Sequence, residues 1–501
     1  MSDISEAYLN AVMSNVAAVL QLKQWSFNKQ SFENIAQNYF GILIPAILTG
    51  RSCEKNVNFS VVLKLAPTDE RYRVSGAVTV MFLREIFVYT KLLHKYREFQ
   101  NLYAISPHFV IPKCYYVCTD YCKEVIVMQN MCEKGYKPYV GTKFLDLDHI
   151  IISLKSLAKF HALSYLLKEK NHNLFEEVKE YCVPLTEKSN KRYIDIMIDR
   201  LKKALQIFEN TPYVPLLEML EKKCVKLIES ATNSTKSLCL CHGDMWMENL
   251  LFQYKDDIPI SACIIDYQTT RICSPAFDVL YLIVSSTSAL LRKEHYGHLL
   301  DTYYQTFEQT LSRVNLNSEV IYSKDMFQYD LSVVGPACLI GVNTATWLSS
   351  GLQREGHVRS KIILNTEREI EEAVSKYSTI IKNIIDDLTS YGYLKNVFER
   401  YSCTHWRQPG EGKSEWSRLG NYCTKPRRYS IGKVVYAIAS TVLKDGDGYV
   451  RVCNIGSDSI IWKKGMTIAR AEKYTTNLER RVVVEEGRGR EVRCGEERRV
   501  V

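Results

Sequence analysis

The stretch between residues 238 and 268 constrains what this chain can fold into more than any other. It contains His242, Asp244 and Asn249 in the spacing H-x-D-x-x-x-x-N, and a further acid, Asp266, ends the next apolar run. Apolar runs that follow Asn249 and precede Asp266 indicate two strands, and the polar residues between them indicate a turn. The pattern therefore predicts a hairpin that carries Asn249 back towards Asp266, so that both side chains can face one metal ion.

These four side chains are of the types that phosphoryl transfer to a hydroxyl group requires. The spacing is that of the catalytic loop of protein-kinase-like phosphotransferases. In that chemistry one carboxylate accepts or orients the hydroxyl proton, while an amide oxygen and a second carboxylate hold Mg²⁺ on the phosphates. Asp244, preceded by His242, fits the first role, and Asn249 and Asp266 fit the other two. Taken singly, each acid could merely end a strand and His242 could be a core histidine; the four together favour phosphoryl transfer.

The residues around these positions resemble those of one family. The run Cys241–Asn249 (CHGDMWMEN), followed by Ile265–Gln268 (IDYQ), is similar to the ecdysteroid-kinase-like (CHK kinase-like) family, which groups with choline kinases and aminoglycoside phosphotransferases. Trp246 and Gln268 favour this group over protein kinases. The resemblance covers about residues 1–395. It implies an α+β, bilobal protein-kinase-like fold, with a β-rich small lobe and a helical large lobe, that uses ATP and Mg²⁺ to phosphorylate a small-molecule hydroxyl.

Lys64 and Glu85 match the phosphate clamp that the resemblance implies. Lys64 lies near the end of an apolar strand predicted over 59–65, and Glu85 lies in the first turns of an amphipathic helix predicted over 82–93. In kinase-like folds a strand lysine holds the phosphates and pairs with a helix glutamate. The alternative is a solvated strand-end lysine and a surface glutamate.

The segment after the strand predicted over 124–128 resembles the family's adenine hinge. It carries the amides Gln129 and Asn130 where the family usually has acids, and Met131 follows. Because hinge backbone groups normally hold adenine, this change does not by itself abolish binding. We predict the adenine contact at Gln129, Asn130 and Met131.

The connection between the first strands departs further from the family. Glycines there normally let backbone N–H groups approach the phosphates. Residues 33–38 contain no glycine, and Gly41 stands alone. This departure favours, as the alternative function, a catalytically weak or inactive nucleotide-binding pseudokinase.

The helical part of the resemblance begins with a helix predicted over 146–170. This helix contains His161, which we expect to be a core histidine. Two helices are predicted within 193–230. Asp278, near the start of a helix predicted over 274–283, is expected to bind backbone close to the catalytic loop.

The composition indicates a large folded protein with a distinct C-terminal part. The 501 residues are 46% hydrophobic and carry a mild net charge of +9, with no basic cluster before residue 400. We therefore expect no nucleic-acid partner for the kinase-like part. The 16 cysteines form no C-x-x-C pair, which disfavours a zinc site. No signal peptide and no uninterrupted apolar stretch of membrane-spanning length is evident, so we expect a cytoplasmic protein with reduced thiols and no membrane contact.

Domain boundaries follow from these patterns and from a change in composition. We predict the small lobe over residues 1–128, the large lobe over 129–398 and an appended β-rich or disordered tail over 399–501. Alternating residues between 432 and 472, with a D-G turn, indicate a hairpin. Residues 479–501, rich in arginine and glutamate, are expected to be disordered.

The tail resembles a segment of retroelement polyproteins that precedes their aspartic protease. The D-[ST]-G triplet of such a protease is missing from the tail, so no protease activity is expected. A gene-model fusion, an inserted element and a genuine appended β-domain remain open. A basic β tail that meets nucleic acid is a further alternative.

The sequence does not identify the acceptor. By resemblance it is a steroid-like alcohol such as an ecdysteroid, and a choline- or ethanolamine-type kinase is the alternative. A choline site needs an acidic or aromatic cage, which the sequence cannot locate. The oligomeric state is likewise not fixed.

Overall fold

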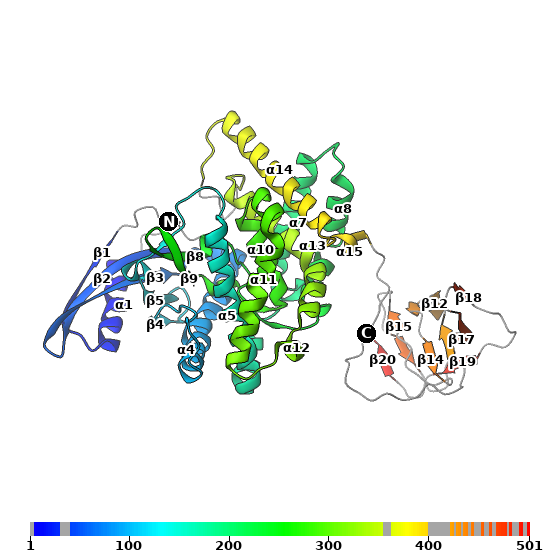
Figure 1. The fold of residues 1–501 in the computed structure, drawn as a ribbon, viewed down its shortest axis with the longest axis horizontal. Helices are drawn as coiled ribbons and strands as arrows, with labels where there is room; N and C mark the ends of the chain where they lie inside the picture. The colour runs from blue at the N-terminus through cyan, green and yellow to red at the C-terminus, as the bar shows by residue number, and fades with distance from the viewer. Residues whose placement is uncertain are drawn as a thin grey trace. The chain divides into compact units, whose positions relative to one another are not determined.

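The structure, a computed structural model, divides into two compact units, Met1–Arg400 and Tyr401–Val501. In the first unit it describes residues 5–30, 41–353 and 362–398, and in the second unit only strands between 421 and 500. Figure 1 shows the elements of both units.

A five-stranded antiparallel sheet forms the small lobe (blue in Figure 1). Its strand order is β1-β2-β3-β5-β4. The strands are β1 (Lys23–Lys29), β2 (Ile42–Ser52), β3 (Lys55–Leu65), β4 (Cys114–Cys118) and β5 (Val125–Gln129). Helix α1 (Glu6–Val19) packs on one face, where its Val12 and Val16 join Val61 and Leu63 of β3 in one core cluster. Because strand residues alternate between faces, Lys64 projects from the opposite face.

The β2–β3 hairpin is longer than the sequence predicts. The sequence pattern predicts a strand over 59–65 in this region, but β2 and β3 pair without interruption from Ile42↔Leu65 to Ser52↔Lys55. Cys53 and Glu54 make the turn with φ of +47° and +63°. Two positive φ angles are typical of a type I′ turn, and the absence of glycine or asparagine there hid the turn from sequence reasoning.

Helices connect β3 to β4 and carry the predicted glutamate. Helices α2 (Glu70–Gly76) and α3 (Val78–Phe87) lead through a π-helical turn, Val88–Leu92, into α4 (Leu93–Leu102). The helix predicted over 82–93 is therefore present. Glu85 lies on the buried face of α3 and is only 1% exposed.

A second, three-stranded sheet carries the predicted hairpin of the large lobe. Its order is β6-β8-β9, with β6 at Tyr136–Pro138, β8 at Leu250–Lys255 and β9 at Ile258–Ile264. Leu250 pairs with Ile264, and the backbone N–H of Ile265 donates to the Asn249 carbonyl oxygen at 3.1 Å. The predicted hairpin is confirmed, and it brings the residues before Asp266 next to Asn249.

Helices make up most of the large lobe (Figure 1). α5 (Leu147–Lys170) contacts β9 and a two-stranded pair formed by β7 (Cys239–Cys241) and β10 (Arg271–Cys273). The region 193–230 contains parts of three helices, where two were predicted. The remaining helices are α6 (His172–Tyr181), α7 (Glu187–Ile207), α8 (Val214–Lys222), α9 (Cys224–Asn233), α10 (Pro275–Ser286), α11 (Ala289–Arg313), α12 (Ser318–Ile321), α13 (Lys324–Ser349), α14 (Glu367–Ser390) and α15 (Lys395–Phe398).

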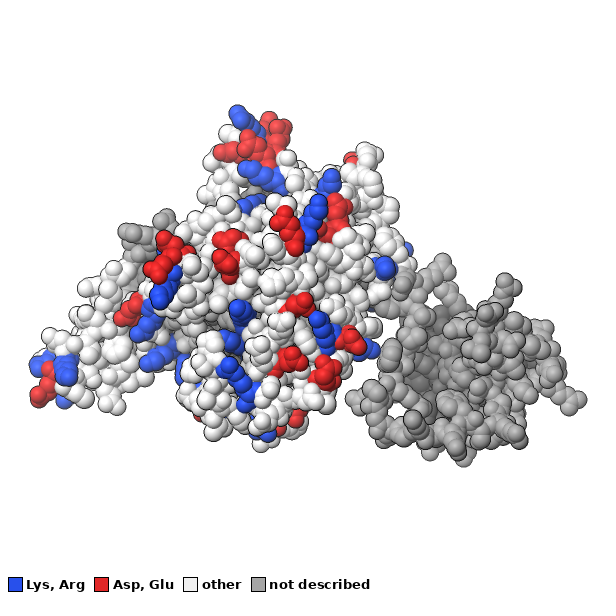
Figure 2. All heavy atoms as spheres, in the orientation of Figure 1, with Lys and Arg blue, Asp and Glu red and all other residues white. Residues whose placement is uncertain are grey.

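Two helical segments of the described residues are long and apolar enough to cross a membrane by length and composition, Leu147–Lys170 and Ser318–Ser349. In each, 78% of the apolar window is buried inside the protein, as expected for a core helix. On the face shown in Figure 2, basic and acidic side chains of the described residues are interspersed over the helices.

The C-terminal unit consists of short strands. They are β11 (Asn421–Thr424), β12 (Arg427–Ile431), β13 (Val434–Ile438), β14 (Val442–Lys444), β15 (Val452–Asn454), β16 (Ile460–Trp462), β17 (Thr467–Asn477), β18 (Arg480–Val482), β19 (Arg490–Arg493) and β20 (Arg498–Val500). β13 and β15 pair antiparallel, as a hairpin requires, while the predicted D-G turn lies outside the described residues. The expected disorder of 479–501 is wrong for β18, β19 and β20, where valines favour strands.

Candidate active site

Lys64 lies where the two lobes meet. Its Nζ atom lies 2.5 Å from Glu85 Oε2 and 2.8 Å from Asp266 Oδ1. Gln268 Oε1 accepts a further, longer hydrogen bond from Lys64 Nζ at 3.4 Å. The two predicted clamp residues, Lys64 on β3 and Glu85 on α3, are therefore in contact. Asp266, the predicted metal ligand, pairs with the same lysine.

The charges around Lys64 do not balance. Burial lowers the pKa of Lys64, but the charges of Asp266 and Glu85 outweigh that effect and raise it. For Glu85, burial raises the pKa of the carboxyl group, and the positive charge of Lys64 only partly offsets this. One lysine shared by two carboxylates leaves a net negative charge when both acids are ionised, and a divalent cation can compensate it.

Asp244 is held through both of its carboxylate oxygens. Asn249 Nδ2 donates to Asp244 Oδ2 at 3.3 Å and to the Asp244 carbonyl oxygen at 2.8 Å. Tyr281, on α10, donates to Asp244 Oδ1 at 3.3 Å. Burial and the negative charge of Asp266 together raise the pKa of Asp244 to about 7, against the lowering effect of Arg271. A carboxylate with a pKa near neutrality is suited to exchange a proton with an acceptor hydroxyl.

The backbone of the catalytic loop is fixed from below by Asp278. Its carboxylate accepts the N–H groups of His242 at 2.5 Å and Gly243 at 3.0 Å. His161, fully buried in α5, places Nε2 3.3 Å from Asp278 and Nδ1 2.8 Å from the Tyr303 hydroxyl. Asp278 therefore binds the backbone of the catalytic loop, as predicted. His161 is a buried core histidine, also as predicted.

Gly243 is required by its surroundings. It has φ of +84°, and a Cβ atom there would lie 2.3 Å from Arg271 Nη1 and 2.4 Å from the Thr269 carbonyl oxygen. Arg271 itself donates to the Gly243 carbonyl oxygen at 2.8 Å. The loop therefore passes closer to Arg271 than any side chain would allow.

His242 contacts the backbone just after β9, next to Asp266. Its Nε2 atom lies 2.9 Å from the Ile265 carbonyl oxygen, and its ring is tilted against Tyr267. Burial lowers the pKa of His242, which favours the neutral ring. This contact links the loop that carries Asp244 to the residue before Asp266. It therefore supports a positioning role for His242, which holds both acids in place.

The donor set at Asn249 and Asp266 suits Mg²⁺, the metal that a kinase-like fold implies. Asn249 donates through its amide nitrogen to Asp244, which leaves the amide oxygen as its hard ligand atom. Asp266 offers carboxylate oxygens and adopts φ of +68°, a strained conformation for a residue other than glycine. Such strain concentrates at functional sites. Carbonyl and carboxylate oxygens are the ligands that Mg²⁺ prefers.

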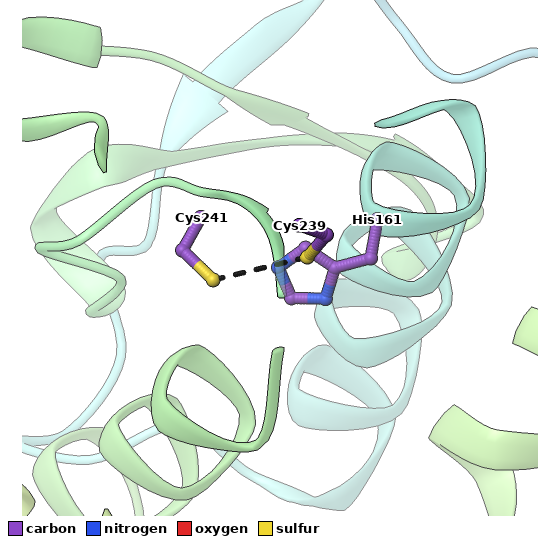
Figure 3. A group of neighbouring side chains, drawn as sticks. All are labelled: His161, Cys239 and Cys241. Atoms are coloured by element: carbon purple, nitrogen blue, oxygen red, sulfur yellow. Dashed lines mark hydrogen bonds between the residues drawn. The ribbon is translucent and has the colours of Figure 1, made fainter. Parts of the chain in front are cut away.

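A second group of ligand-type side chains lies below the loop (Figure 3). The ligand atoms of His161, Cys239 and Cys241 lie within 4.8 Å of one another, and the two Sγ atoms are 3.9 Å apart. Both ring nitrogens of His161 already have partners in Asp278 and Tyr303. Burial raises the pKa of both thiols, and a thiol must lose its proton to bind a metal. This group is better explained as hydrogen-bonded core.

The predicted adenine hinge leaves the small-lobe sheet at β5. Gln129 ends the strand, and Asn130 caps the turn that begins at Met131 by accepting the Cys132 N–H group at 3.1 Å. The Asn130 amide also donates to Ser60 Oγ at 3.0 Å. Asn130, one of the two amides in the predicted hinge, therefore holds the hinge backbone in place through both ends of its side-chain amide.

The predicted phosphate loop, residues 33–38, lies outside the described residues. Its flanks are described: Gln30 donates its N–H to the Pro45 carbonyl oxygen at 2.8 Å, and Gly41 precedes β2. A Cβ atom at Gly41 would lie 3.2 Å from the Leu65 carbonyl oxygen and 3.5 Å from Lys64 Cγ. The backbone at Gly41 therefore lies close to Lys64, where a side chain would be crowded.

Sequence reasoning missed Tyr281 and Arg271. Arg271 is a buried cation in a short strand, with no pattern around it that marks a contact to Gly243. Tyr281 had a signal: it lies three residues after Asp278, so both project from one face of α10 towards the catalytic loop.

The sequence model of the ecdysteroid kinase-like family matches residues 35–316, more than half of the chain. No curated protein matches it. Among solved structures, the GDP and kanamycin complex of APH(2")-IIia is 13% identical with a TM-score of 0.36, over 75% of this chain and 98% of its own. A glucosamine kinase is 11% identical with a TM-score of 0.31, over 67% of this chain and 80% of its own. These structural likenesses are distant, and the assignment rests on the family match: the chain belongs to the ecdysteroid kinase-like family.

Proposed function

We propose that this protein transfers the γ-phosphoryl group of ATP to a hydroxyl group of a small molecule, and specifically to that of a steroid-like alcohol. The observation that carries the proposal is the meeting of Lys64, Glu85 and Asp266 at 2.5–2.8 Å, with Asn249 linked to Asp244 beside them. A phosphate-binding cation, two hard metal ligands and a base thus occupy one site. Family membership supports the steroid-like acceptor.

In this proposal each residue contributes one element of an in-line displacement. Asp244 orients the acceptor hydroxyl and accepts its proton. The acceptor oxygen forms a bond to the γ-phosphorus as the bond from that phosphorus to the bridging oxygen breaks, and ADP leaves. Lys64, oriented by Glu85, holds the phosphates. Mg²⁺, when held by Asn249 and Asp266, would neutralise charge on the phosphate oxygens.

A nucleotide-binding protein without turnover is the second candidate. The lack of glycine in residues 33–38 favours it, whereas the three polar residues Asp244, Asn249 and Asp266 oppose it. The two candidates agree that ATP binds and differ in whether the γ-phosphate is transferred.

The experiment is a screen of acceptors with MgATP, in which ADP release is measured. Steroids with free hydroxyls, amino-alcohols such as choline and ethanolamine, and aminoglycosides or amino sugars form the panel, and a reaction without acceptor is the control. We expect ADP release with a steroid-like alcohol. ADP release with choline alone would contradict the acceptor class. Thermal stabilisation by MgATP without ADP release on any acceptor would favour the second candidate.

A further inference from the structure

Tyr281 reaches the catalytic carboxylate from a different element than the catalytic loop. It lies on α10, is 3% exposed, and donates its hydroxyl to Asp244 Oδ1 at 3.3 Å. The other oxygen, Oδ2, accepts from Asn249, which belongs to the same loop as Asp244. The Tyr281 contact therefore ties the carboxylate to the helical core.

The ring of Tyr281 is itself held on two sides. The Phe277 ring stacks against it at 5.7 Å between centroids. On α13, Gly341 faces it so closely that a Cβ atom there would lie 3.0 Å from Tyr281 Cε2. Cys338, one turn before Gly341, donates its thiol to the Phe277 carbonyl oxygen at 3.4 Å. Glycine at 341 thus leaves room for a tyrosine ring whose position the two helices fix.

We propose that Tyr281 is a positioning residue for phosphoryl transfer: its hydroxyl holds the Asp244 side chain in the orientation that meets the acceptor hydroxyl, and Gly341 makes room for it. This inference rests on the proposed function. Both hydrogen bonds to the Asp244 carboxylate are long, at 3.3 Å. Catalytic hydrogen bonds are often long before substrates bind and shorten in the reacting complex.

The alternative is that Tyr281 is an ordinary core residue whose hydroxyl needs a partner because it is buried. In that case phenylalanine would fill the same space, and only stability would respond to the change. A positioning role predicts instead that turnover falls while ATP binding does not change.

The test compares Tyr281→Phe with wild type in the full chain. We expect kcat to fall roughly tenfold, the usual scale for a hydrogen bond to a charged group, with the KM for ATP unchanged. The matched control is Tyr165→Phe, which removes another buried hydroxyl, one that donates to Ser237 Oγ at 3.1 Å. It should leave kcat unchanged.

Gly341→Ala gives an independent variant. The added Cβ would press on the Tyr281 ring, so kcat should fall in wild type and change little further in the Tyr281→Phe background. Unchanged kcat in Tyr281→Phe, with an active wild type, would overturn the inference and leave the proposed function standing.

A wild type that releases no ADP with any acceptor would instead overturn the proposed function. The contact can then be followed by near-ultraviolet difference absorption, because a tyrosine that donates to a carboxylate absorbs at longer wavelength. Asp244→Ala should shift a tyrosine band in an otherwise wild-type chain and not in the Tyr281→Phe chain. If Asp244→Ala produced the same difference spectrum in the wild-type and Tyr281→Phe backgrounds, the inference would be overturned.

Discussion

Asp244 and Asp266 are both aspartates at one site, and their neighbours separate their roles. Asp266 pairs with the positively charged Lys64 at 2.8 Å. Asp244 has uncharged donors, Tyr281 and Asn249, on its carboxylate. An acid beside a cation suits a metal ligand, whereas an acid whose pKa lies near neutrality suits proton transfer. The sequence could assign these roles from spacing, but the neighbours that separate them come from distant segments.

The acidic limb of turnover should report Asp244. Burial and the negative charge of Asp266 together raise the pKa of Asp244 to about 7. A base must be ionised, so kcat/KM for the acceptor, which reports the free enzyme, should fall as pH drops below about 7 and level off above it. A raised carboxyl pKa also means that the folded state binds the proton more tightly, so the stability gained from this proton is lost as pH rises through about 7. A limb near pH 4 would contradict the assignment.

Asp266→Asn should weaken the hold on Mg²⁺. The substitution removes a charge next to Lys64, and the phosphates of ATP still supply ligands for the ion. We expect turnover to fall roughly 10²-fold, with a smaller loss of ATP affinity and a higher Mg²⁺ requirement in a titration followed by ADP release.

Asp301→Asn is the matched control for that titration. Asp301 pairs with Lys324 at 2.8 Å on the surface, with about half of each side chain exposed. It should behave as wild type. An Mg²⁺ dependence of Asp266→Asn equal to that of wild type would mean that Asp266 is not a metal ligand.

At the scale of elements, the hairpin β8–β9 and the strand-to-helix pair of Lys64 and Glu85 were predictable, because local patterns define each of them. β1 was not predicted: its residues, Lys23–Lys29, are mostly polar and its side chains are mostly exposed. The third helix within 193–230 was missed because the breaks between α7, α8 and α9 contain no glycine. Both misses occur where the local sequence lacks the usual signals, and β1 is instead defined by its pairing with β2.

Gly243→Ala tests the close passage of the catalytic loop. The Cβ atom would lie 2.3 Å from Arg271 Nη1, and φ is +84°. We expect the free energy of unfolding to fall by about 1–3 kcal/mol and turnover to fall with it. Gly297→Ala on α11 is the control, because a Cβ atom there meets nothing within 4 Å. It should raise the free energy of unfolding by about 0.5–1 kcal/mol. Equal melting curves for the two variants would contradict this account of the loop.

For the whole molecule, the end of the kinase-like unit can be tested by truncation. Val397 of α15 is fully buried, and its carbonyl oxygen accepts a hydrogen bond from Lys223 Nζ at 2.6 Å. We expect a chain ending at Arg400 to keep the melting curve and ATP binding of the first unit. A chain ending at Leu394 should lose about 1.5–3 kcal/mol, the scale of burying one apolar side chain. An insoluble chain ending at Arg400 would mean that the first unit needs the second.

The central claim is that this protein transfers a phosphoryl group to a small-molecule alcohol, with Asp244 serving the hydroxyl. The most direct measurement is the transfer of labelled γ-phosphate from ATP to an acceptor found in the screen, for wild type and Asp244→Ala in the presence of Mg²⁺. We predict a labelled phosphomonoester with wild type and a rate lower by roughly 10²–10⁴-fold with Asp244→Ala, at an unchanged melting temperature. Equal label on the acceptor in both proteins, with both folded, would contradict the account.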